Sequence, residues 1–287
     1  MKKVLAIMPD KSADLNLADY LNFLAANISI EAVNSLHIFT ANHLFQHLNE
    51  AGDDYGSTLL KRIKETMEKE LDGAFQEIPN KQVEVVAGKT TIAEIIRKGY
   101  HSTFDLMALG EHDKSDTTLA KQIIRHVPGN ALFVPEKAAK KLSHILVPVD
   151  LSEHSAKILA VAIGLSQLSA VDLKITCYHS FEVPTIASVP VIQAETQFIE
   201  VVKQNNYKAL HQFVDEQAGE NRSAVNEVVQ EQIASRPDKA ILNYAMENGV
   251  DLIIMGTSGH SIIDAWLGST VERVISQNDS IPMLIIK

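Results

Sequence analysis

The sequence predicts an α/β protein with two tandem domains, each a doubly wound, five-stranded parallel sheet covered by helices on both faces. Short apolar runs alternate with longer amphipathic segments along all 287 residues, which is the pattern of parallel sheets with helical crossovers. The second half also repeats the order of these segments seen in the first half. We place the domains at residues 1–137 and 142–287, because proline, lysine and alanine replace the apolar periodicity between them.

The apolar runs locate ten strands in two matching sets. In the first domain we expect strands near 3–8, 35–39, 82–87, 104–109 and 130–134. In the second domain we expect strands near 145–149, 171–178, 224–229, 250–255 and 282–286, with helices near 153–168, 192–217, 237–248 and 269–277. The fourth strands show the repeat directly, since FDLMALG at 104–110 parallels VDLIIMG at 250–256.

Charge and hydropathy exclude several classes of partner. The chain has 26 Lys and Arg against 36 Asp and Glu, a net charge of −10, and no extended basic cluster. This balance argues against nucleic acid and anionic membrane as partners. No apolar run approaches the length of a membrane span, and the N-terminal run is too short for a signal peptide, so we expect a cytoplasmic protein. The single cysteine, Cys177, lies in a predicted strand and is expected to be a buried, inert thiol.

A glycine loop after the fourth strand of the second half indicates a phosphate site. Gly256 and Gly259 follow the strand directly, and glycines allow a sharp turn and a close approach to a ligand. Farther on, Gly268 precedes a helix start at which Ser269 is the expected N-cap, with Glu272 completing a capping box. The exposed N–H groups of such a helix start attract phosphate oxygens, so the pattern predicts a nucleotide phosphate site.

Two blocks of the second half resemble the universal stress protein family. Its nucleotide-binding members carry Gly-x2-Gly-x9-Gly-Ser/Thr after the fourth strand, and here Gly256 and Gly259 match while eight residues precede Gly268 instead of nine. Residues 144–153, HILVPVDLSE, look like the first strand of the family with its terminal acidic residue, Asp150. The chain is identified as a tandem two-domain member, which implies an adenine nucleotide alpha-hydrolase-like fold.

The resemblance implies an adenine nucleotide as ligand: ATP or another adenine nucleotide, with magnesium as a possible companion ion. It places Val149 and Asp150 against adenine and ribose, and Ser180, after the second strand, at the adenine edge. Met255, Gly256 and Gly259 would form the floor and phosphate turn, and Gly268, Ser269 and Thr270 would donate to the phosphates. It also implies pairing of the two domains within one chain through the last strands, at 132–134 and 284–286, and leaves a homodimer and unidentified protein partners open.

Two roles remain open for Asp150. As a turn residue it would open the following helix, although Ser152 is the better N-cap because the apolar helix stripe begins just beyond it. As a site residue it would lie at the carboxyl edge of a central strand, where doubly wound folds bind ligands, and would accept hydrogen bonds from ribose hydroxyls or hold a divalent cation.

The first copy lacks the features of this site. After its fourth strand it reads Gly110-Glu111-His112-Asp113, with no second glycine, and the distance to the next strand is 20 residues instead of 26. Pro9 stands in place of Asp150, and two acidic residues lie where a phosphate would bind. We therefore expect a degenerate nucleotide site and a structural or protein-binding role for residues 1–137.

Three kinds of function fit these observations. A nucleotide-binding stress-response regulator or interaction protein fits best. An interaction module with a vestigial site is the alternative, favoured by the degenerate first copy and the shortened loop. A slow ATP hydrolase is the third, but His260 is the only candidate general base near the phosphate loop. The sequence predicts no catalytic residue and no metal site, because the histidines are scattered without ligand-like spacing.

Overall fold

The computed structural model describes residues 2–8, 11–40, 55–88, 90–111, 114–182, 192–232, 236–257 and 268–287. The chain forms two compact units, Met1–Lys140 and Lys141–Ile286, which divide inside the predicted linker. No helix in the described ranges is long and apolar enough to cross a membrane.

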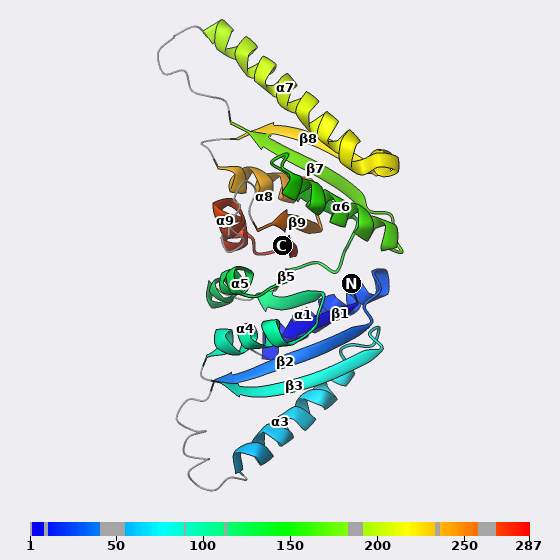
Figure 1. Cartoon of the computed structure of the whole chain (residues 1–287), viewed down its shortest axis with the longest axis vertical. Coiled ribbons are helices and arrows are strands. Elements are labelled where there is room, and N and C mark those ends of the chain that lie inside the picture. The colour runs from blue at the N-terminus through cyan, green and yellow to red at the C-terminus, as the bar shows by residue number, and fades with distance from the viewer. Residues whose placement is uncertain are drawn as a thin grey trace. The chain divides into compact units, whose positions relative to one another are not determined.

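The first unit is a parallel sheet built from strand–helix–strand repeats (Figure 1). Its strands run in the order β3-β2-β1-β4-β5, and all neighbours are parallel. Its described elements are β1 (Lys3–Ile7), α1 (Lys11–Asn27), β2 (Ala32–Thr40), α3 (Tyr55–Asp72), β3 (Asn80–Gly88), α4 (Thr91–His101), β4 (Leu106–Glu111), α5 (Lys114–His126) and β5 (Asn130–Pro135).

The second unit repeats this arrangement with the strand order β10-β9-β6-β7-β8, again with parallel neighbours. Helices α6 and α7 pack on each other, as do α8 and α9, and the right-handed crossovers put the two pairs on opposite faces of the sheet. Its elements are β6 (His144–Pro148), α6 (Glu153–Leu168), β7 (Lys174–Phe181), α7 (Ile192–Ala218), the 3-10 turn η1 (Gly219–Ala224), β8 (Val225–Glu231), α8 (Pro237–Glu247), β9 (Leu252–Gly256), α9 (Ser269–Gln277) and β10 (Met283–Ile286).

The central strands are apolar because both of their faces are covered. Residues Ile145–Val147 of β6 and Ile253–Ile254 of β9 are fully buried, and the facing stripe of α6 buries Ile158, Leu159 and Ala162. Continuous apolar runs of this kind, without polar alternation, are what a two-sided parallel sheet requires.

The predicted α/β class and the parallel sheets are confirmed. Helices α6 and α9 have the predicted bounds, and Ser152 caps α6 as expected, its side chain accepting the N–H of Ser155 at 3.2 Å. The predicted strand at 171–178 is wrong by three residues, since β7 begins at Lys174 and continues to Phe181. Ser180 therefore lies within the second strand and not after it.

Candidate functional site

The strand order of the second unit reverses between β6 and β9, and a crevice opens there. From β6 the chain moves through α6 to β7 on one side, while β9 lies on the other side. Doubly wound sheets bind ligands at such a switch point, outside the carboxyl ends of the strands. Strands β6 and β9 pair at only two positions, Ile145 with Leu252 and Leu146 with Ile253. The equivalent strands of the first unit, β1 and β4, pair at four positions.

Pro148 explains why the ladder between β6 and β9 stops early. The N–H of the next residue, Val149, donates to the Tyr178 carbonyl of β7 at 2.8 Å. Successive backbone N–H groups of a strand point to opposite sides, so the nitrogen of Pro148 faces β9, and proline has no hydrogen to donate. In the first unit Ile7 occupies this position, and its neighbour Met8 donates to Leu36 of β2 at 3.0 Å in the matching place.

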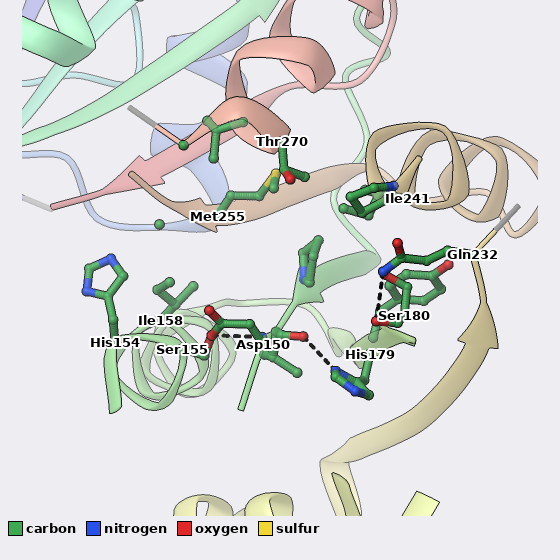
Figure 2. Close-up of a pocket in the computed structure, with 17 residues that line it drawn as sticks. Asp150, His154, Ser155, Ile158, His179, Ser180, Gln232, Ile241, Met255 and Thr270 are labelled. Atoms are coloured by element: carbon green, nitrogen blue, oxygen red, sulfur yellow. Dashed lines mark hydrogen bonds between the residues drawn. The ribbon is translucent and has the colours of Figure 1, made fainter. Parts of the chain in front are cut away.

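A pocket of about 380 Å³ lies at this crevice (Figure 2). Its walls are the carboxyl ends of β6, β7 and β9, the first turns of α6, α8 and α9, and Gln232, the residue after β8. The lining residues are Pro148, Val149, Asp150, His154, Ser155, Ile158, Tyr178, His179, Ser180, Gln232, Pro237, Ile241, Met255, Gly256, Gly268, Thr270 and Val271.

Most of the residues expected at a ligand site meet in this one pocket. They come from three strand ends and one helix start, and they are Val149, Asp150, Ser180, Met255, Gly256, Gly268 and Thr270. Ser269 is exposed and does not line the pocket. Gly259 and His260 belong to the segment 258–267, which lies outside the described residues.

The Asp150 carboxylate is held by the start of α6. Its Oδ1 accepts the Ser152 N–H at 3.1 Å, the Ser152 hydroxyl at 2.5 Å and the Ser155 hydroxyl at 2.6 Å. Between them Leu151 adopts a φ of 63°, a left-handed conformation that is strained for a branched side chain. Asp150 is thus a turn residue that also lines the pocket, and its role as a ligand-binding residue stays a prediction.

The helix start at α9 differs from the prediction by one position. Gly268, not Ser269, is the N-cap, with φ −62° and ψ 140°, and no side chain of the described residues caps the helix. The Gly268 N–H is also engaged, because it donates to the Thr257 carbonyl at 2.7 Å. Within the described part of the chain, the first-turn N–H groups without an acceptor are therefore those of Ser269, Thr270 and Val271, since the Glu272 N–H donates to the Gly268 carbonyl at 3.1 Å.

His154 covers the end of β9. A Cβ at Gly256 would lie 2.4 Å from Nε2 of His154 and 2.6 Å from Cδ1 of Ile158, so only glycine fits there without movement. The Nε2 atom is buried and has no hydrogen-bond partner in the part of the chain that the structure describes. No local pattern points to His154, because its contact with Gly256 depends on α6 crossing the carboxyl end of β9.

The carboxyl end of β7 forms the opposite wall. The His179 ring lies 3.0 Å from the Val149 carbonyl and 3.0 Å from Oδ1 of Asn206 in α7. The Tyr178 hydroxyl donates to Oε1 of Gln230 at 3.2 Å, and burial raises the pKa of this phenol. These polar residues at a strand end were not predicted as site residues, although polarity at the end of an apolar strand is a usable signal.

A second titratable cluster lies on η1, α7 and β8, away from the pocket. His211, Asp215 and Glu227 could place ligand atoms within 4.8 Å of one another. However, the Arg222 guanidinium lies among them, with Nε 2.5 Å from Oδ1 of Asp215 and a direct ion pair to Glu227. An arginine among the carboxylates supplies the positive charge that a metal would supply, so this cluster is structural.

The chain is similar to known proteins over both halves. Residues 141–287 match the model of the universal stress protein family. Over 146 residues the chain is 31% identical to universal stress protein YxiE of Bacillus subtilis (strain 168), covering 50% of this chain and 97% of that protein. The fold is similar to that of a universal stress protein from Archaeoglobus fulgidus DSM 4304, with TM-score 0.67, 16% identity, and 99% and 98% of the two chains covered. It is also similar to a protein of unknown function from Pseudomonas aeruginosa PAO1, with TM-score 0.59, 17% identity, and 100% and 92% covered.

Proposed function

The chain belongs to the universal stress protein family, as the resemblance implied, and from this premise we propose that its second domain, residues 142–287, binds an adenine nucleotide, ATP in the first place. We propose further that the protein acts as a nucleotide-dependent regulator or interaction protein in the stress response. One observation carries the binding proposal: a single pocket joins the Asp150 carboxylate to the uncapped first turn of α9.

The two sides of the pocket suit different parts of a nucleotide. The N–H groups of Thr270 and Val271 lie at a helix start that no side chain of the described ranges caps, and such a start favours phosphate oxygens. The side chains of Ile158, Ile241 and Met255 offer apolar surface for a base. A volume of about 380 Å³ is within the ordinary range of small-molecule sites.

The direct test is a search for ligand in protein purified without added nucleotide. Mass spectrometry of the acid-released supernatant should find an adenine nucleotide, and calorimetric titration of the stripped protein with ATP should show binding. Gly256→Val should abolish that binding, because the branched side chain would collide with His154 and fill the pocket. The proposal is wrong if stripped, folded protein binds neither ATP, ADP nor AMP.

The role of Asp150 is tested by comparing three nucleotides. If the carboxylate holds the ribose hydroxyls, Asp150→Asn should weaken ATP, ADP and AMP by similar factors. If it holds magnesium beside the phosphates, the loss should be largest for ATP and should vanish when magnesium is removed.

The matched control is Ser152→Ala. Ser152 does not line the pocket, but it caps α6 and donates to Asp150. This variant should lose about 1 kcal/mol of stability and retain its affinity. If Asp150→Asn and Ser152→Ala lose affinity by equal factors, Asp150 acts only as a turn residue.

The first domain, residues 1–137, is proposed to hold no nucleotide. Glu111, which follows Gly110 as Thr257 follows Gly256, is a nearly buried side chain at the end of β4. A carboxylate at this place would repel a phosphate, and the β1–β4 ladder is four pairs long, without the early end that the β6–β9 ladder has at Pro148. Calorimetry should therefore give one nucleotide per chain, and a stoichiometry of two would contradict this.

A further inference from the structure

The Gln232 side chain lies at the β7–β8 end of the pocket in a fixed orientation, and its Oε1 accepts no hydrogen bond from the described residues. The Gln232 backbone N–H donates to the Phe181 carbonyl at 2.8 Å, which continues the ladder one residue past β8. Its side-chain Nε2 donates to the Ser180 carbonyl at 3.0 Å and lies 3.0 Å from the Ser180 hydroxyl. Figure 2 shows this contact and the oxygen of the carboxamide on the side of Ile241.

These contacts determine which end of the carboxamide faces the pocket. A backbone carbonyl only accepts hydrogen bonds, so the group beside the Ser180 carbonyl must be the NH2 end of Gln232. Oε1 therefore points away from Ser180, and no donor among the described residues reaches it. The family resemblance placed Ser180 at the adenine edge, and the Ser180 carbonyl already accepts a hydrogen bond from Gln232.

Among the described residues, one side-chain donor remains on the Ser180 side of this end of the pocket: the Ser180 hydroxyl accepts from Nε2 of Gln232 and keeps its own hydrogen. The Tyr178 hydroxyl donates to Gln230, and the His179 ring is held between the Val149 carbonyl and Asn206. Of the described lining, Pro237 and Ile241 add apolar surface. On the Ile241 side of Gln232, a ligand would meet this apolar surface and the outward acceptor Oε1 of Gln232.

We infer that Gln232 is the specificity-determining residue of the proposed nucleotide site, and that it selects a purine with a 6-amino group, adenine, over 6-oxo purines. This inference rests on the proposed function. An adenine 6-amino group would donate to Oε1 while Nε2 remains on Ser180, so no protein contact has to break. The 6-oxo group of hypoxanthine or guanine would place a second oxygen against Oε1 and leave both without a donor.

The test compares ATP with inosine triphosphate by calorimetric titration of the full chain. The wild-type protein should bind ATP about 10- to 100-fold more tightly than inosine triphosphate. Losing one hydrogen bond and leaving one acceptor unpaired lowers the affinity by about this factor. Gln232→Leu should lower the affinity for ATP and leave the affinity for inosine triphosphate unchanged, so that the ratio of the two affinities approaches one. Gln212→Leu is the matched control, since Gln212 is an exposed residue of α7 that donates to Glu216 and lies outside the pocket lining, and this variant should keep the wild-type ratio of the two affinities.

A ligand-side experiment does not depend on how the variants fold. Purine riboside triphosphate has hydrogen in place of the 6-amino group, and the wild-type protein should bind it about tenfold more weakly than ATP. The inference about Gln232 is wrong if ATP binds but Gln232→Leu leaves the ratio of the ATP and inosine triphosphate affinities unchanged. It is also wrong if purine riboside triphosphate binds as tightly as ATP. In both cases the proposed function stands. If the wild-type protein binds none of the three, the proposed function fails and the inference fails with it.

Discussion

Gly256→Ala is the substitution whose effect follows most directly from the geometry. The added methyl would lie 2.4 Å from Nε2 of His154, 2.5 Å from its Cδ2 and 2.6 Å from Cδ1 of Ile158. Gly256 does not have a positive φ, so alanine strains no backbone there. The whole cost is therefore the overlap with two side chains of α6.

The expected cost is that of overpacking a core by one methyl group. Such insertions cost about 1–3 kcal/mol, because side chains leave their preferred rotamers or the backbone moves. Both colliding residues line the pocket, so relief of the overlap must also change its shape. We expect the second unit to lose about 1–3 kcal/mol of unfolding free energy.

Cys177 provides the assay for this unit. It is the only cysteine in the chain, it is fully buried in β7, and burial raises the pKa of its thiol to about 12. Labelling of Cys177 in graded urea therefore reports opening of the second unit in the full-length protein. The control is Gly164→Ala in α6, whose Cβ meets nothing within 4 Å and which should gain about 0.5–1 kcal/mol.

A double substitution separates the overlap from other causes. His154→Ala with Ile158→Val removes all three colliding atoms. In that background Gly256→Ala should cost less than about 0.5 kcal/mol, because nothing is left to overpack. If Gly256→Ala lowers the unfolding free energy as much in that background as in the wild type, or does not lower it in the wild type, the overlap with His154 and Ile158 is not the cause.

Three further predictions concern the surroundings of the site. Leu151→Asn should raise the urea midpoint of Cys177 labelling by an amount equivalent to about 0.5–1 kcal/mol, because asparagine tolerates the left-handed φ of 63°; a lower midpoint would contradict the strain. Arg222→Ala should lower stability by about 1–3 kcal/mol, because the nearly buried Glu227 carboxylate loses its guanidinium, and the loss should be smaller when Glu227→Gln is also present. The Arg236 guanidinium lowers the pKa of the buried Asp238 carboxyl from 3.8 to about 2, so this carboxylate stabilises the fold above pH 4 and the contribution is lost as the pH falls from about 4 to 2. Urea midpoints in that range should fall less in Asp238→Asn than in the wild type.

The sequence predicts the fold well because its strands are buried on both faces. A continuous apolar run such as 250–255 is compatible with few other structures when amphipathic segments flank it. The prediction failed for β7, where His179 and Ser180 are polar and lie in the strand because they face the pocket. At α9 it missed the cap by one residue, since Gly268 takes the extended N-cap conformation that we assigned to Ser269.

The site was predictable only where its residues lie close to a motif. Asp150, Gly256 and Thr270 follow strand ends or open a helix, so local patterns point to them. His154 and Gln232 do not, because the first acts through a contact with β9, about a hundred residues later in the chain, and the second through a contact with Ser180. Contacts of this kind depend on strand order, which periodicity does not reveal.

The two copies show how small a change separates a closed sheet from one with a ligand crevice. Both units have the same strand order, and both donate from the residue after the first strand to the second strand, Met8 to Leu36 and Val149 to Tyr178. The position before it is Ile7 in one copy and Pro148 in the other, and the ladder on the opposite side is four pairs long beside Ile7 and two pairs long beside Pro148. Because proline removes a donor without adding bulk that must be buried elsewhere, it opens the switch point at little cost to the rest of the sheet. The presence of the crevice is thus set at the strand ends, while the buried parts of the two sheets remain alike.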